Sequence, residues 1–141
     1  MIQNVMLSIT GRQEYEGQEP DSIELMTEGT LEKVEGGWRI GYVESELTGL
    51  DGVHTTFDIT PGKIVLTRKG PLNSEMVFQE GVFNESLYQM EFGALMITVC
   101  AAKVAYDITE AGGTIDLTYA IDIEQNAAGF IIYHLDITPI K

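Results

Sequence analysis

The chain has few cysteines and few basic residues, and each shortage excludes a class of protein. Its 141 residues include one cysteine, Cys100, so no internal disulfide can form and packing must supply the stability. We therefore expect a reducing, cytoplasmic location. Lys and Arg total 8 against 22 Asp and Glu, which gives a net charge of -14. With no local basic patch in the sequence, neither nucleic acid nor an anionic membrane surface is an expected partner.

Long hydrophobic runs are also lacking. The most apolar stretch extends from Ala94 to Ala102 and stops at Lys103. This is short of the roughly 20 apolar residues that a membrane helix needs. The first ten residues have no basic segment followed by an uninterrupted apolar one, so we expect no signal peptide. The sequence predicts no association with a membrane.

Apolar residues nevertheless make up 44 % of the chain, enough to build a hydrophobic core. A length of 141 residues fits one domain, and we expect residues 1–141 to form it. Disorder and disulfide scaffolds are poor fits to this composition. The expected product is a soluble globular domain.

Apolar and polar residues alternate with a period of two. In residues 114–124 the odd positions are large and apolar, whereas the even ones are mostly Thr and Asp. The same alternation recurs in residues 53–60 and 131–138. It is typical of strands with one face toward a core and one toward water.

Turn-forming residues divide the chain at short intervals, with Gly or Pro at most of the boundaries. They delimit about ten strands, near residues 2–14, 22–34, 38–47, 53–60, 63–69, 73–80, 83–91, 94–108, 114–124 and 130–138. Strands joined by tight turns form an antiparallel meander, and a long meander must close to avoid unpaired edges. The sequence predicts an all-β fold: an up-and-down meander that closes into a lipocalin-like β-barrel of about 8–10 strands.

The segment 38–49 places polar residues where a barrel strand has inward positions. Ile40, Tyr42, Glu44 and Glu46 share one face, and Val43 and Leu47 belong to the other. If the first face is internal, two carboxylates point into the barrel, where each needs a partner. The pattern leaves open the alternative that Val43 and Leu47 belong to the core while the two carboxylates are exposed.

Arg68 is the partner we expect for these carboxylates. It shares a strand face with Ile64 and Leu66, and the following strand presents Ser74, Met76 and Phe78 on one face. Apolar walls with a few polar groups describe a pocket for a small, partly apolar ligand.

Catalytic and metal-binding patterns are weak. Glu44 and Glu46 could form an acid–base pair, but Glu-x-Glu is common on exposed strands. His54 and His134 are the only histidines, and neither belongs to a triad or a His-x-x-x-His motif, so both are interpreted as surface residues. Cys100 is interpreted as a core thiol. We expect no metal and no cofactor.

Five segments carry a resemblance to a known family: ELMTEGTL (24–31), YVESELTG (42–49), LTRKG (66–70), NSEMVF (73–78) and LYQMEFG (87–93). They resemble the YwiB-like family of small bacterial proteins. The resemblance implies a lipocalin-like, or calycin-type, barrel. It does not imply a particular biochemical function. The matching positions are Tyr42, Glu44, Glu46, Thr48, Gly49, Arg68, Gly70, Ser74, Met76, Phe78, Tyr88 and Gly93.

Three function classes follow from these observations. The leading one is a module that binds a small, partly apolar molecule inside the barrel, oriented by Glu44, Glu46 and Arg68, with Tyr42, Ser74, Met76, Phe78 and Tyr88 as the other candidate contacts. The alternative is a structural or protein-interaction barrel with a filled core that acts through its acidic surface. An enzyme that uses Glu44 or Glu46 as acid or base is the least favoured. A monomer and a homodimer both stay open.

Overall fold

The computed structural model describes residues 2–14, 21–44, 52–90, 93–124 and 126–140, and all regular structure in these ranges is β-strand. The ten strands are β1 (Ile2–Glu14), β2 (Asp21–Val34), β3 (Gly37–Val43), β4 (His54–Thr60), β5 (Lys63–Lys69), β6 (Ser74–Phe78), β7 (Phe83–Met90), β8 (Gly93–Thr109), β9 (Gly112–Ile123) and β10 (Asn126–Pro139). The described residues include no helix with the length and apolarity to span a bilayer.

All ten expected strands are present, and two boundaries differ in an informative way. The third expected strand ends at Val43, and positions 45–47 of that prediction lie outside the described residues. The tenth strand starts earlier than predicted, at Asn126. The segment Ala127 to Gly129, which we interpreted as a turn, is instead a bulge in the β9–β10 ladder. Shortly before β10 begins, Glu124 has a left-handed backbone conformation, with φ of 51°.

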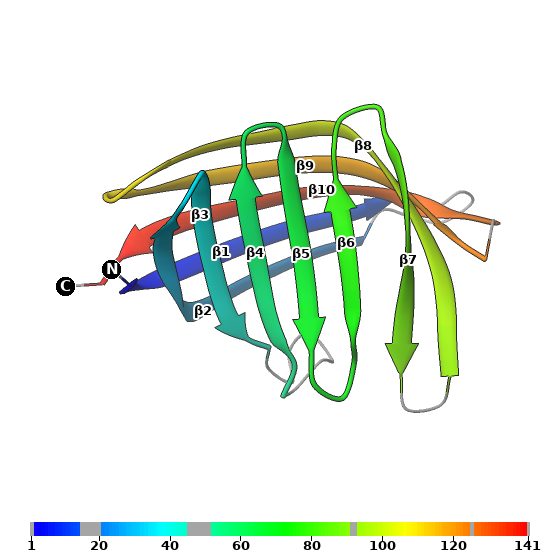
Figure 1. The fold of residues 1–141 in the computed structure, drawn as a ribbon, viewed down its shortest axis with the longest axis horizontal. Coiled ribbons are helices and arrows are strands. Elements are labelled where there is room, and N and C mark those ends of the chain that lie inside the picture. Colours follow the sequence, from blue (N-terminus) through cyan, green and yellow to red (C-terminus); the bar gives the residue numbers. More distant parts are fainter. Residues whose placement is uncertain (1, 15–20, 45–51, 91–92, 125, 141) are drawn as a thin grey trace.

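The strands form one antiparallel sheet in the order β6-β5-β4-β3-β2-β1-β10-β9-β8-β7, which confirms the predicted meander. Sheet curvature brings β6 and β7 together, so the sheet is a nearly closed barrel. Figure 1 shows β4, β5 and β6 crossing steeply in front of the long strands β1, β9 and β10. β8 begins alongside β7 and bends into this rear layer, and its register shifts between Ala101 and Lys103.

The barrel has a seam between β6 and β7. Within the described residues, a single bridge pair, Asn73 with Gln89, joins the start of β6 to β7 through two backbone hydrogen bonds of 2.9 and 2.8 Å. Farther along, Glu80 bridges to Ala101 of β8, and its Oε2 accepts a hydrogen bond from the Val104 amide at 2.9 Å. That carboxylate satisfies an amide next to the register shift of β8.

Inward side chains of β3 to β6 form three transverse rows, because the register places them opposite one another. Two rows are apolar and belong to the core: Trp38, Ile59, Ile64 and Phe78, then Ile40, Phe57, Leu66 and Met76. The third row is polar: Tyr42, Thr55, Arg68 and Ser74. The polar row lies at the end of the barrel where β3 leaves β2, since the β2–β3 ladder covers only residues 30–34 of β2.

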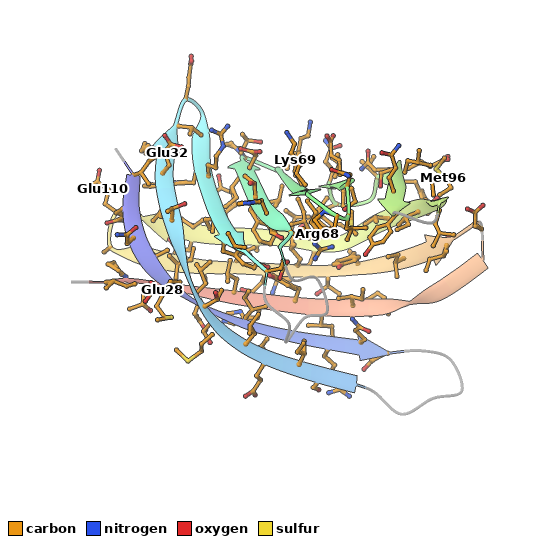
Figure 2. All side chains as sticks on the ribbon, turned by 90° about the horizontal axis from the view of Figure 1, so that it is seen from below. Glu28, Glu32, Arg68, Lys69, Met96 and Glu110 are labelled. Carbon is orange, nitrogen blue, oxygen red and sulfur yellow. The ribbon has the colours of Figure 1, made fainter. Side chains whose placement is uncertain are left out.

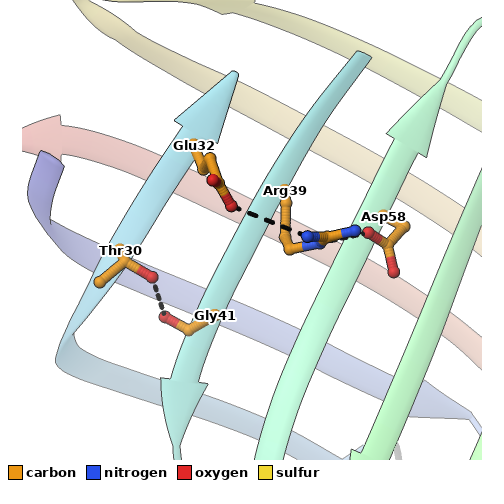
Figure 3. A network of polar contacts seen from close by, with 5 residues as sticks. All are labelled: Thr30, Glu32, Arg39, Gly41 and Asp58. Carbon is orange, nitrogen blue, oxygen red and sulfur yellow. Dashed lines mark hydrogen bonds and ion pairs between the residues drawn. The ribbon is translucent and has the colours of Figure 1, made fainter. Parts of the chain in front are cut away.

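The outer face of the same strands carries ordinary surface pairs. Arg39 Nε lies 2.7 Å from Asp58 Oδ1, and Arg39 Nη1 lies 3.7 Å from Glu32 Oε1 (Figure 3). The hydrogen bond with Asp58 raises the pKa of Arg39. Such exposed pairs add little to stability.

Candidate functional site

Tyr42 and Glu44 point into the barrel, which settles the orientation that the sequence left open. Tyr42 is 8 % exposed and Glu44 3 %, whereas Val43 between them is 50 % exposed. The alternative that placed Val43 in the core is therefore wrong, and Leu47 lies outside the described residues. Glu44 extends the β3–β4 pairing, because its amide donates to the Val53 carbonyl at 2.8 Å.

The Glu44 carboxylate has two unlike oxygens. Oε2 accepts a hydrogen bond from the Thr55 hydroxyl at 2.7 Å and lies 3.7 Å from Arg68 Nε. Glu44 and Arg68 therefore form an ion pair, but at 3.7 Å the two atoms are too far apart for a hydrogen bond. Within the described part of the chain, Glu44 Oε1 and Arg68 Nε are both buried without a hydrogen-bond partner.

Arg68 is held inside the barrel by its place in the polar row. In Figure 2 it lies between the two layers of strands, whereas the adjacent Lys69 projects to the outside. Its side chain is 19 % exposed, compared with 50 % for Arg39 on the outer face. The polar row thus places a cation beside a buried carboxylate, as the sequence predicted.

Two tyrosines from opposite walls meet at this ion pair. Burial raises the pKa of Tyr42 well above its ordinary value, the Glu44 carboxylate raises it further, and Arg68 lowers it. Burial likewise raises the pKa of Tyr133 on β10, and the neighbouring Tyr42 adds to this effect. Both hydroxyls are therefore neutral at physiological pH. They interact with each other, yet the Tyr133 hydroxyl makes no hydrogen bond of ordinary geometry with a described residue.

These groups border a cavity of about 230 Å³ between the two layers. Its polar walls include Tyr42, Glu44, Arg68 and Tyr133. The remaining lining residues come from the long strands: Ile9, Gly11, Gln13, Ile23, Leu25, Tyr119 and Ile131. Aromatic contacts support two of the tyrosine rings, with Phe57 6.0 Å from Tyr133 and Phe78 4.7 Å from Tyr119 between ring centroids.

The structure brings together only some of the residues predicted for the site. Tyr42, Glu44 and Arg68 line the cavity. Ser74 is next to Arg68 in the polar row and lines a separate hollow of about 280 Å³ beside the seam, which Arg68 also borders. Met76 and Phe78 lie in the apolar rows, and Tyr88 packs against the core from β7. Glu46 lies outside the described residues.

Sequence reasoning missed Thr55, Tyr119 and Tyr133 as site residues. The alternation of apolar and polar residues in 114–124 and 131–138 already predicts that Tyr119 and Tyr133 face inward. The sequence does not show that these two tyrosines lie opposite Glu44 and Arg68, because that placement depends on how the sheet closes.

A larger hollow of about 590 Å³ lies where β2 and β3 diverge and is lined largely by outer-face residues such as Thr30, Gly41 and His54. We do not assign it as the site, because it borders none of the buried polar atoms that have no described partner. In Figure 3 the Thr30 hydroxyl reaches the Gly41 carbonyl beside this hollow, at 3.5 Å.

One polar cluster lies outside the barrel. His134 on β10 is held between two carboxylates, with Nδ1 2.6 Å from Asp116 Oδ1 and Nε2 3.1 Å from Asp136 Oδ2. The hydrogen bond with Asp116 raises the pKa of His134, and Asp136 acts in the same direction. His134 is on the surface, as interpreted, but it is paired. In the described ranges, no group of three or more His, Cys, Asp or Glu is placed to hold a metal ion.

The comparisons with known proteins give a family match and a solved structure of the same fold. Residues 7–137 match the family described as "Domain of unknown function (DUF1934)". The structure is similar to the crystal structure of the YwiB protein from Bacillus subtilis, with a TM-score of 0.90, 19 % identity, and coverage of 99 % of this chain and 94 % of that one. No curated protein matches the chain. The resemblance expected from the five sequence segments is confirmed by these findings.

Proposed function

The chain belongs to the DUF1934 family, and we propose that it binds a small, partly apolar molecule in the barrel interior, with Glu44 and Arg68 as polar anchors. The family assignment brings no activity with it, so the proposal stands on the cavity and on the chemistry of its walls.

The observation that carries the proposal is the convergence of three buried polar atoms on one cavity. Glu44 Oε1, Arg68 Nε and the Tyr133 hydroxyl have no hydrogen-bond partner among the described residues, and all three side chains line the cavity. Leaving a buried polar group unsatisfied costs about 1–3 kcal/mol, and more for a charged group. A ligand that pairs with these atoms would recover this free energy on binding.

The rest of the lining suits such a ligand. The long strands contribute isoleucine and leucine side chains to the wall beside Gln13, Tyr119 and Tyr133, so the cavity combines apolar surface with a few polar groups. A volume of about 230 Å³ is smaller than the roughly 300–1,000 Å³ of pockets for drug-sized ligands. The expected ligand is therefore small.

The competing function is a barrel that acts only through its acidic surface. In that case the Glu44–Arg68 pair would be a structural polar network, and its removal would alter stability without altering ligand content. Measuring ligand content and stability on the same variants separates the two functions.

Native mass spectrometry of the freshly purified protein tests the proposal. The intact mass is compared with the denatured mass, and any dissociated compound is extracted and identified. The measurement is repeated on Arg68→Met and on Arg39→Met, which makes the same change on the outer face. We expect a stoichiometric extra mass in the wild-type protein and in Arg39→Met, and its loss in folded Arg68→Met.

An extra mass retained by both variants would place the compound elsewhere and overturn the proposal. Glu46 enters the test through its own variant, Glu46→Gln, because it lies outside the described residues. Loss of the compound in that variant would add Glu46 to the anchors.

A further inference from the structure

Two charged side chains at the polar end of the cavity have complementary hydrogen-bonding roles. Arg68 Nε can only donate, and the Glu44 carboxylate can only accept. Both atoms are buried and without a described partner, and the Tyr133 hydroxyl beside them can do either. A complementary ligand group must therefore offer an acceptor to Arg68 and a donor to Glu44 at the same time.

The charge of the site limits the ligand further. The carboxylate and the guanidinium carry opposite charges and lie 3.7 Å apart, so together they are neutral. An anion in this cavity would meet the buried Glu44 carboxylate, and a cation would meet Arg68. Either would leave an uncompensated charge in a buried site, which is costly. The polar group of the ligand should be uncharged.

The walls favour a flat body. Tyr42 lines the cavity from β3, while Tyr119 and Tyr133 line it from the long strands together with Ile9 and Leu25. A planar ring can stack on or pack edge-on against the tyrosine rings while it buries its apolar surface.

We infer that the ligand class is a small planar ring bearing an uncharged amide-type group, a carboxamide or a lactam. Its carbonyl oxygen accepts from Arg68 and its N–H donates to Glu44. This inference rests on the proposed function and deepens it by naming what the cavity takes.

Three probe compounds of nearly the same shape differ in charge and in whether they donate or accept hydrogen bonds. Benzamide is neutral and has both a donor and an acceptor, benzoate is an anion with acceptors only, and benzamidine is a cation with donors only. Toluene supplies the ring alone. Each is titrated into the full chain at pH 7 and about 0.15 M salt, which screens the field of the acidic surface. Chemical shifts of the backbone amides report whether binding is at the cavity.

For the wild-type protein we expect benzamide to bind at the cavity at least tenfold more tightly than benzoate, benzamidine or toluene. Two variants should then change the preference in opposite directions. Glu44→Gln leaves the Arg68 charge unbalanced and should favour benzoate over benzamidine. Arg68→Met leaves the Glu44 charge unbalanced and should favour benzamidine over benzoate.

A purely structural ion pair would not produce this opposite change. If Arg68→Met fails to fold, Glu44→Gln alone decides the question, because it preserves the size and shape of the side chain. A wild-type preference for benzoate, benzamidine or toluene at the cavity would overturn the ligand class and leave the binding function standing. If none of the four compounds shifts the amides of the cavity residues, the ligand class fails, and the native mass spectrometry described above decides the proposed function separately.

Discussion

The Thr55 hydroxyl donates to Glu44 Oε2 at 2.7 Å, at a point where both side chains are buried. This bond satisfies one oxygen of the carboxylate and fixes its orientation, so that the other oxygen is left for the cavity. A threonine in the polar row thus positions the acceptor of the proposed site.

Replacing Thr55 by valine should destabilise the protein. The change keeps the shape of the side chain and removes the donor, which leaves both oxygens of a buried carboxylate without a hydrogen bond from β4. We expect a loss of about 1–3 kcal/mol in the free energy of unfolding, measured by urea denaturation. Thr56→Val is the matched control on the outer face and should change stability by less than about 0.5 kcal/mol. Equal effects of the two changes would contradict the role given to Thr55.

Arg68 and Arg39 should differ strongly in their contribution to stability. Arg68→Met leaves the buried Glu44 carboxylate without its cation and should cost about 2 kcal/mol or more. Arg39→Met breaks only exposed pairs and should cost less than about 1 kcal/mol. Thermal and urea unfolding of the two variants measure the difference. Similar losses in the two variants would show that the interior pair is no stronger than a surface pair.

The His134 cluster should make stability depend on pH. Since Asp116 and Asp136 raise its pKa above 6.5, protonated His134 stabilises the folded state. This contribution is complete below about pH 6.5 and is lost as the pH rises through the raised pKa. The stability difference between the wild type and His134→Gln should therefore shrink between pH 6 and pH 9, starting from a value below about 1 kcal/mol because the ring is partly exposed.

Asp116→Asn provides the control for that measurement. It removes the stronger of the two carboxylate partners, so the effect of His134→Gln in this background should be smaller and depend less on pH. A difference that grows with rising pH would contradict the assigned direction.

Two glycines of β3 should respond differently to alanine. A Cβ at Gly37 would overlap the Ile59 carbonyl oxygen, so the strands would have to separate. A Cβ at Gly41 would meet Thr30 Oγ1 at 3.5 Å, an ordinary contact. We expect Gly37→Ala to lower the free energy of unfolding by more than about 2 kcal/mol and Gly41→Ala by less than about 1 kcal/mol, measured by thermal unfolding. Comparable melting temperatures for the two variants would contradict the close approach of β3 and β4.

The strands and the barrel could be predicted because each depends on local signals. Alternation in residues 114–124 identifies a strand without reference to the rest of the chain. Glycine or proline residues mark most of the boundaries between the ten strands. The orientation of residues 38–44 could not be decided in the same way, since both faces carry apolar residues. It is set by the register with β4 and β5, which places Ile40 opposite Phe57 and Phe57 opposite Leu66.

The pairing of Asp116 with His134 shows a second limit of sequence reasoning. Near the turn Ile123 pairs with Asn126, but beyond the bulge Ile121 pairs with Gly129, so the register shifts by one residue. Without that bulge Asp116 would oppose Tyr133 instead of His134, and every facing pair would change. The alternation in residues 114–124 and 131–138 identifies the two strands but does not fix the register between them.

The ladder between β1 and β10 also determines when the proposed site can form. It joins residues as distant in the sequence as Val5 and Pro139 and brings Tyr133 opposite Gly11. During synthesis from the N-terminus, Glu44, Thr55 and Arg68 emerge long before β10, which supplies the facing wall. Contacts this distant in sequence form slowly, because a long loop must close first. Binding at the proposed site would therefore require the completed barrel, and a ligand that binds there would favour closure over a partly folded chain.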